Sequence, residues 1–156
     1  MTPTTTQLEL VVWKSLLAVS NLSERNLIQP YTKKELIIIM PKYKIIINPV
    51  SGKGTGKDHI PGIEQVLKEL GLDYDLVTTE RVGHAIELTR EAVAAGYDVV
   101  VAGGGDGTCN EVINGLMRAK AAGLGTAAMG VISIGRGNDF AFSMGLPTQW
   151  EAGVRL

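Results

Sequence analysis

The pattern of apolar and polar positions becomes regular at about residue 40. From there, short apolar runs alternate with segments in which apolar residues recur every three or four positions. The apolar runs predict β-strands at 42–48, 74–79, 97–102 and 129–134. The segments with helical spacing predict α-helices at 58–70, 84–95 and 109–119, and a last helix that begins near Gln149. This alternation of strand and helix is typical of an α/β fold, an open parallel sheet with helices on both faces.

The first part of the chain follows a different pattern. Residues 7–28 have the spacing of a helix, but they contain no motif with a chemical interpretation. We therefore interpret residues 1–39 as an N-terminal extension of unknown role and residues 40–156 as the domain. Because the last predicted helix stops at Leu156, we expect a domain that is truncated before a further, C-terminal part.

Composition narrows the range of functions. The 156 residues include 15 Lys and Arg against 16 Asp and Glu, so the chain has no basic field of the kind that binds nucleic acids. The single cysteine, Cys109, excludes an internal disulfide and fits a reducing compartment. The longest apolar runs are far shorter than the ~20 residues that span a bilayer. We expect a cytoplasmic protein that does not bind nucleic acid, and whose exposed sheet edge or last helix could pair with another copy.

Glycine is concentrated where predicted strands end. All 19 glycines follow residue 51, and nine of them lie in three short segments, 52–56, 103–107 and 135–137. Parallel sheets bind ligands at the edge formed by the carboxyl ends of their strands. Glycine lets the backbone approach an anion closely, and a helix that starts just after such a loop adds its positive dipole end. Three such loops predict a site for a polyphosphate ligand; the alternative is that they are only tight strand-to-helix turns.

The loop sequences exclude two common nucleotide-binding motifs. A Walker A loop would need a glycine at Ser51 and a hydroxyl residue at Asp58. A Rossmann fingerprint that starts at Gly103 would need a glycine at Thr108. Any phosphate site in this chain must therefore be of another kind.

An aspartate stands in the middle of the second glycine segment. We expect Asp106 to be buried among backbone N–H donors, where an unpaired carboxylate is costly, so that it needs a ligand. Two roles are open: Asp106 could coordinate Mg²⁺ that bridges phosphates, or accept the proton of an attacking hydroxyl. Asn110 and Glu111 follow at the same edge, and their alternative interpretation is the ordinary polarity of a helix N-terminus.

Three segments, in this order and spacing, carry a family resemblance. They are NPVSGKG at 48–54, GGDGTCNEVINGL at 104–116 and GRGNDFA at 135–141. Together they resemble the diacylglycerol kinase catalytic domain family, which includes bacterial lipid kinases, ceramide kinases and sphingosine kinases and is more distantly similar to NAD kinases. The resemblance implies ATP-dependent phosphorylation of a lipid such as diacylglycerol, with transient membrane contact. ATP and its Mg²⁺ would bind between this domain and a C-terminal β-rich domain.

The resemblance also implies which residues form the site. Asp106 would lie nearest the transferred phosphoryl group, as the catalytic residue. No metal ligands are assigned in this domain, because the resemblance places a structural Mg²⁺ site and the catalytic base in the C-terminal part. Arg136 departs from the family pattern, which has a small residue there; a guanidinium would hold a phosphate bidentately instead. The residues implied to bind the nucleotide are Asn48, Pro49, Ser51, Gly52, Lys53, Thr79, Gly104, Gly105, Gly107, Thr108, Asn110, Glu111, Gly135, Arg136, Asn138 and Asp139.

Two other functions stay open. One is an NAD kinase-like enzyme that acts on a soluble nucleotide, and the other is a non-catalytic nucleotide-binding module. Within the lipid kinase interpretation, we expect the isolated chain to have weak or no activity, because half of the cleft would be missing. Lys53, Lys57 and Arg81 could steer phosphate or be solvated surface charges, and we expect Cys109 to pack beneath the second loop.

Overall fold

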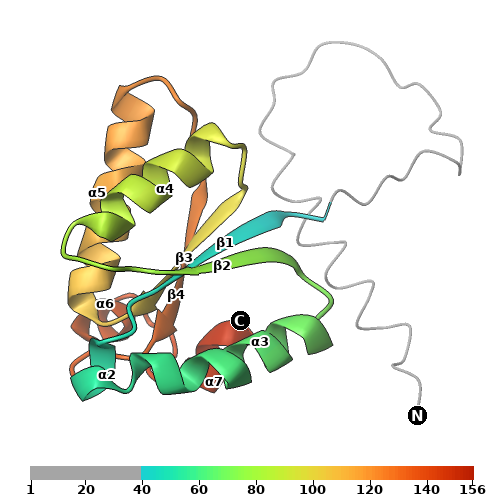
Figure 1. Cartoon of the computed structure of the whole chain (residues 1–156), viewed down its shortest axis with the longest axis vertical. Coiled ribbons are helices and arrows are strands. Elements are labelled where there is room, and N and C mark those ends of the chain that lie inside the picture. The colour runs from blue at the N-terminus through green and yellow to red at the C-terminus, as the bar shows by residue number, and fades with distance from the viewer. Residues whose placement is uncertain (1–39) are drawn as a thin grey trace, which may run out of the picture. The chain divides into compact units, whose positions relative to one another are not determined.

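The sheet has the predicted parallel arrangement. The computed structural model describes residues 40–156, and the helix expected at 7–28 lies outside them. Within the described part, four strands form one sheet in the order β2-β1-β3-β4 (Figure 1). All neighbouring strands pair in parallel, which confirms the predicted sheet. The strands are β1 (Lys42–Ile47), β2 (Asp73–Thr78), β3 (Val99–Gly104) and β4 (Ala128–Ser133).

Helices cover both faces of the sheet, as predicted. α3 (Ile60–Glu69) and α7 (Trp150–Val154) lie on one face, below the sheet in Figure 1. α4 (His84–Ala94) and α5 (Asp106–Ala121) lie on the other face, with α4 above the sheet and α5 along its left side in the same view. None of these helices, nor any other between residues 40 and 156, is long and apolar enough to cross a lipid bilayer.

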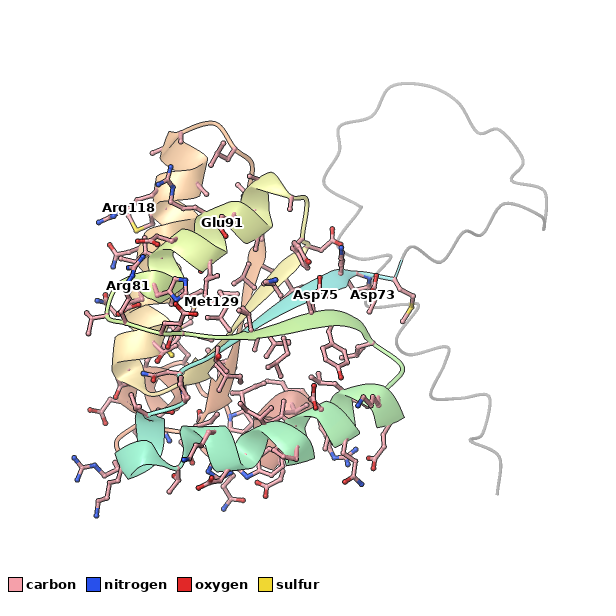
Figure 2. All side chains as sticks on the ribbon, in the orientation of Figure 1. Asp73, Asp75, Arg81, Glu91, Arg118 and Met129 are labelled. Carbon is pink, nitrogen blue, oxygen red and sulfur yellow. The ribbon has the colours of Figure 1, made fainter. Side chains whose placement is uncertain are left out.

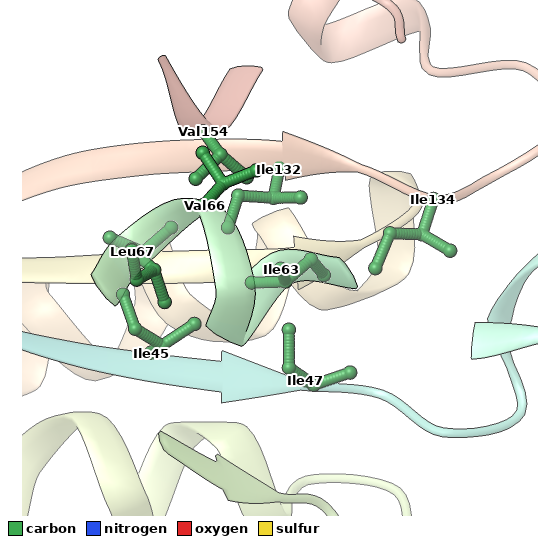
Figure 3. Packing of buried hydrophobic residues seen from close by; sticks show 9 residues of the cluster. Ile45, Ile47, Ile63, Val66, Leu67, Ile132, Ile134 and Val154 are labelled. Carbon is green, nitrogen blue, oxygen red and sulfur yellow. The ribbon is translucent and has the colours of Figure 1, made fainter. Parts of the chain in front are cut away.

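The alternation of side chains along the strands divides the core in two. Ile45 and Ile47 of β1 contact the face that α3 and α7 cover, whereas Ile46 contacts the face of α4 and α5. Figure 3 shows the first cluster, in which Ile63 and Leu67 of α3 meet the strand residues. All three isoleucines of β1 are at most 1% exposed. Burial on both faces explains why this strand is a continuous apolar run rather than an alternating one.

Short helical turns lie where the sequence predicts loops. They are α2 (Ser51–Gly54), η1 (Gly56–His59) and α6 (Asp139–Ser143). α5 also begins at Asp106, three residues before the predicted start at Cys109. The backbone oxygen of Gly105 accepts the N–H groups of both Thr108 and Cys109, at 3.0 and 3.1 Å, and so closes the first helical turn inside the glycine segment.

The strand order reverses between β1 and β3. The chain runs outward from β1 to β2, crosses back to β3, and continues outward to β4 on the other side. At such a reversal the loops that leave the two central strands diverge to opposite faces, and a crevice opens between them. β1 leads into the first glycine segment, and β3 includes the first two glycines of the second, Gly103 and Gly104, before the loop begins. The topology therefore brings both segments to the same crevice.

Candidate functional site

A cleft of about 620 Å³ opens at the carboxyl edge of the sheet. Loops that follow all four strands contribute to its walls, so residues far apart in the sequence come together there. The predicted site residues that line it are Asn48, Pro49, Ser51, Gly52, Thr79, Gly105, Gly107, Thr108, Glu111 and Gly135. The crevice expected from the strand order is thus present as a cleft, and ten of the residues proposed to bind the ligand line it.

The remaining predicted residues do not line this cleft. Gly104 is buried at the end of β3, behind the cleft wall. Lys53, Arg136 and Asp139 are exposed, and Asn110 is exposed on α5, where Asn114 donates a hydrogen bond to its side-chain oxygen at 3.2 Å. The other two predicted residues outside the lining are Asp106 and Asn138.

The loop after β1 is folded by its own polar groups. The side-chain oxygen of Asn48 accepts the N–H of Val50 at 3.1 Å, and the hydroxyl of Ser51 donates to the backbone oxygen of Asn48 at 2.8 Å. Lys53 has a φ of +71°, which is uncommon for a residue other than glycine. This turn leaves the Lys53 side chain exposed rather than in the cleft.

The second and third glycine segments touch at their backbones. A Cβ added at Gly135 would lie 2.5 Å from the Cα of Gly105, so no side chain fits between the two loops. The N–H of Ile134 also donates to the backbone oxygen of Gly104 at 2.8 Å, which extends the pairing of β3 and β4 into the loops. Glycine at this point serves a close approach of two backbones, and the two loops form one continuous wall.

The prediction that Asp106 is buried is wrong. The side chain is exposed at the start of α5, and its Oδ1 accepts the N–H of Phe140 at 2.8 Å. Phe140 lies in the first turn of α6, whose N–H groups have no acceptor within the helix. Asp106 therefore has a structural contact that links α5 to α6, and its carboxylate needs no ligand to offset burial.

Asn138 holds the loop after β4 from inside. The residue is 8% exposed, and its backbone has a φ of +55°, in the left-handed region that asparagine tolerates better than most residues. Its side-chain amide donates to the backbone oxygens of Gly135 at 3.1 Å and Thr148 at 3.3 Å. These contacts tie both ends of the loop together and keep Gly135 at the cleft.

The loop between β2 and α4 forms a wall that the motif patterns did not reveal. Glu80, Arg81, Val82 and Ala85 line the cleft beside Thr79. The guanidinium of Arg81 donates to Glu87 at 2.5 Å, and this contact raises the pKa of Arg81 and lowers that of Glu87. Figure 2 shows Arg81 at the carboxyl end of β2, opposite to Asp73 and Asp75 at its amino end.

A signal for this wall was present in the order of the elements. Thr79 directly follows β2, and β2 pairs with β1 along its whole length, so the residues after both strands reach the same edge. Val50, in the loop after β1, also lines the cleft without belonging to the predicted set. Of the lining residues outside the predicted set, the sequence indicates only Arg81, as a side chain that could steer phosphate. Glu80, Val82, Ala85 and Val50 are apolar or acidic and belong to no phosphate-binding motif, so the motifs did not indicate them.

Cys109 packs beneath the first turn of α5, as expected. It is 3% exposed, and burial, with a smaller contribution from the charge of Asp106, raises the pKa of its thiol to about 11. At neutral pH the thiol is therefore protonated, and it acts as a small apolar side chain.

Comparison with known proteins identifies the family. Residues 42–156 match the family described as diacylglycerol kinase catalytic domain. The chain is 36% identical over 110 residues to a diacylglycerol kinase of Bacillus subtilis, an alignment that covers 70% of this chain and 35% of that protein. It is 39% identical over 105 residues to a diacylglycerol kinase of Staphylococcus saprophyticus, covering 67% of this chain and 33% of the relative.

Solved structures agree with this result. A crystal structure of a diacylglycerol kinase from Bacillus anthracis superposes with a TM-score of 0.62 at 26% identity, over 74% of this chain and 40% of the other. The chain spans about a third of the length of the curated relatives it matches. The family match, the fold and the three glycine segments agree, and the chain belongs to the diacylglycerol kinase catalytic domain family.

Proposed function

We propose that this chain supplies the nucleotide-binding half of an ATP-dependent lipid kinase. The observation that carries the proposal is the convergence of four loops on one cleft of about 620 Å³ beside the N-terminus of α5. The names of the relatives support a diacylglycerol-like lipid as the acceptor. A lipid acceptor in turn favours a cytoplasmic protein that contacts a membrane transiently.

The phosphates of ATP would bind at the first turn of α5. Because the helix begins at Asp106, the N–H groups of Asp106 and Gly107 have no acceptor within it. A Cβ added at Gly107 would meet nothing within 4 Å, so the space beside this turn is open. The dipole of this 16-residue helix adds to the attraction of the N–H groups for an anion. The loop after β1 and Thr79 would hold the rest of the nucleotide.

Mg²⁺ fits this site as a companion of the phosphates. Among residues 40–156, no group of three or more His, Cys, Asp or Glu side chains is placed to hold a metal ion. Protein-bound Mg²⁺ usually keeps water and phosphate oxygens as ligands and takes one or two carboxylates. Asp106 offers an exposed carboxylate beside the first turn of α5, so it would hold the ion that neutralises phosphate charge.

In the proposed reaction, the hydroxyl oxygen of the lipid attacks the γ-phosphorus of ATP. The new O–P bond forms while the bond to the β,γ-bridging oxygen breaks, ADP leaves, and the hydroxyl proton passes to a base. Catalysis of such a transfer comes mainly from positioning and charge stabilisation. The contribution of this chain is to orient the nucleotide through loops that are hydrogen-bonded to one another.

Substitutions at Gly107 test the proposal with little effect on the fold. Gly107→Ala adds a methyl group in open space, and we expect it to retain ATP binding. Gly107→Glu places a carboxylate at the proposed phosphate position, so ATP affinity should fall at least about tenfold through like-charge repulsion. Gly107→Gln has the same size without the charge and should lose less. Calorimetric titration with Mg·ATP, and with adenosine as the uncharged control, measures these affinities.

Two results would contradict the proposal. One is a wild-type chain that does not bind Mg·ATP, and the other is an equal loss of ATP affinity in the Glu and Gln variants. Transfer of labelled γ-phosphate from ATP to diacylglycerol tests whether the chain is only the nucleotide-binding half of a kinase. The expected result for the isolated chain is ATP binding without transfer, whereas transfer that Asp106→Asn abolishes would show that the chain is a complete kinase.

A further inference from the structure

We propose that Glu111 is a positioning residue that sets one wall of the nucleotide cleft, rather than a ligand of the nucleotide. This wall consists of the β2–α4 loop, residues 79–83, to which Thr79, Arg81 and Val82 belong, and of Ala85 in the first turn of α4. Glu111 stands on α5 and reaches across to this loop. The inference rests on the proposed function, because it concerns what holds the nucleotide cleft in shape.

Both oxygens of the Glu111 carboxylate accept backbone hydrogen bonds from the β2–α4 loop and the start of α4. Oε1 accepts the N–H of Gly83 at 2.9 Å, and Oε2 accepts the N–H of Ala85 at 3.2 Å. α4 begins at His84, so these N–H groups belong to a helix end where no intrahelical acceptor exists. A carboxylate at this position also complements the positive end of the α4 dipole. The contact therefore joins two helices through one charged, bidentate link.

The chemistry of the site argues against direct phosphate binding by Glu111. The side chain lines the cleft and is partly exposed there, and a carboxylate next to a polyphosphate would repel it. Both oxygens of the Glu111 carboxylate already accept hydrogen bonds from backbone N–H groups of the protein, those of Gly83 and Ala85. A residue with this charge and these partners stabilises the binding wall instead of the ligand.

The β2–α4 loop gains its link to α5 from Glu111. Among residues 40–156, the other side-chain hydrogen bonds of the loop are local: the N–H of Glu80 donates to Nδ1 of His84 at 3.1 Å, and Arg81 donates to Glu87 at 2.5 Å. These contacts join the loop to its own helix and do not set its distance from the first turn of α5. Val82, at 93% exposure, has little packing to hold it. Loss of the Glu111 contact should therefore loosen this wall while the sheet stays intact.

Glu111→Gln tests the inference most directly. A glutamine offers one carbonyl oxygen, so one of the two N–H groups loses its acceptor and meets an amide NH₂ instead. We expect amide exchange at Gly83 and Ala85, measured by NMR, to speed up about tenfold, while the amides of β1 and β3 keep their protection. Affinity for ATP, ADP and AMP should fall by a similar factor for all three, because the wall and not the phosphate count is changed.

A matched control and a second variant sharpen the test. Glu91→Gln makes the same charge change on an exposed position of α4 outside the cleft, and should leave both exchange and affinity unchanged (Figure 2). Glu111→Asp keeps the charge but shortens the side chain by one methylene, so it should also speed exchange at Gly83 and Ala85. The Asp variant keeps the inference testable if the Gln variant does not fold.

The outcomes separate this inference from the proposed function. Unchanged exchange at Gly83 and Ala85 in both Glu111 variants would overturn the positioning role, whatever the nucleotide affinities are. A loss that is confined to ATP, or tighter ATP binding by the Gln variant, would overturn it as well, since either points to a direct charge effect on phosphate. Failure of the wild-type chain to bind nucleotide would reject the proposed function, while the exchange result would still decide the role of Glu111 in the fold.

Discussion

Asp106 combines a position at the cleft edge with a contact that supports the fold. Its Oδ1 caps α6 through the N–H of Phe140, and its charge lies beside the open first turn of α5. The hydrogen bond to Phe140 holds the exposed carboxylate in a defined position.

The two roles of Asp106 can be separated by substitution. Asp106→Asn keeps an oxygen that can accept the N–H of Phe140, so stability should remain close to wild type, whereas Asp106→Ala should lose about 1 kcal/mol, as for other lost helix caps. Urea unfolding measures both values. If the Asn and Ala variants are equally stable, the contact to Phe140 contributes nothing to the fold. Under the proposed function, the matching substitutions in a diacylglycerol kinase of this family should abolish phosphate transfer.

Helix packing sets the position of the α5 N-terminus at the cleft. Gly115 lies where α5 crosses α4, and a Cβ there would be 2.5 Å from Cβ of Thr89 and 2.9 Å from the backbone oxygen of Ile86. Thr89 is fully buried, so it has little space to move. The glycine lets the two helices approach closely, and this approach helps to bring Glu111 of α5 within reach of the N-terminus of α4.

Two glycine substitutions in the same helix should differ in their effect on stability. Alanine has the higher helix propensity, by up to about 1 kcal/mol, at any interior position. At Gly115 overpacking costs about 1–3 kcal/mol, so Gly115→Ala should be less stable than wild type. Gly107→Ala meets open space and should be as stable as wild type or slightly more stable. Equal urea midpoints for the two variants would show that α4 and α5 can separate without cost.

The amino ends of three strands are joined by one polar cluster. Tyr97, just before β3, donates its hydroxyl hydrogen bond to Asp75 of β2, across β1 between them. Lys42 and Lys44 of β1 lie over the Tyr97 ring, at 4.5 and 5.3 Å from its centroid. The hydrogen bond lowers the pKa of Asp75 below its ordinary 3.8 and raises that of Tyr97 above its ordinary 10.0.

These pKa shifts predict how the contribution of the contact depends on pH. Because folding lowers the pKa of Asp75, its hydrogen bond to Tyr97 stabilises the fold fully above pH 3.8. This stabilisation is lost as the pH falls through the lower pKa of the folded state. Because folding raises the pKa of the Tyr97 hydroxyl, the stabilisation from this group is complete below pH 10.0. It is lost as the pH rises through the higher pKa of the folded state. Tyr97→Phe should therefore lower the urea midpoint at neutral pH, and this difference from wild type should shrink in acid. An equal difference at both pH values would contradict the contact.

At the scale of the whole molecule, the sheet, its covering helices and the cleft all lie between Lys42 and Val154. The family match covers the same stretch, residues 42–156. We propose that residues 40–156 are the folding and nucleotide-binding domain. Residues 1–39 would then be an addition with a separate role.

A shortened chain tests this division. A protein that begins at Met40 should unfold at the same urea concentration as the whole chain and bind Mg·ATP with the same affinity, because the contacts that shape the cleft are retained. Circular dichroism and calorimetric titration measure the two properties. A large loss of stability or of affinity would show that residues 1–39 belong to the domain.

Much of the architecture could be predicted from local pattern. The run from Ile45 to Ile47 predicts a doubly covered strand because each residue must be apolar when both faces are buried. The glycine segments predict the sheet edge at which the cleft lies, since only such backbones approach one another as closely as Gly105 and Gly135 do. These features depend on neighbouring residues and on chain order, which the sequence contains directly.

The partners of charged side chains could not be read from local pattern. Glu111 lies 28 and 26 residues from the amides of Gly83 and Ala85 that it binds, and Asp106 lies 34 residues from Phe140. The sequence motifs predict that both carboxylates lie near the phosphates of the ligand. In the folded chain, however, a carboxylate oxygen accepts a hydrogen bond from whichever donor the packed helices bring within about 3 Å. The amino-acid sequence alone thus determined the family, the parallel sheet and the cleft edge, through periodicity and glycine. The tertiary structure decided which side chains at this edge face the cleft and which hold its walls. These roles depend on the strand order and on the crossing of α4 and α5, because hydrogen bonds between distant residues exist only once the chain is packed.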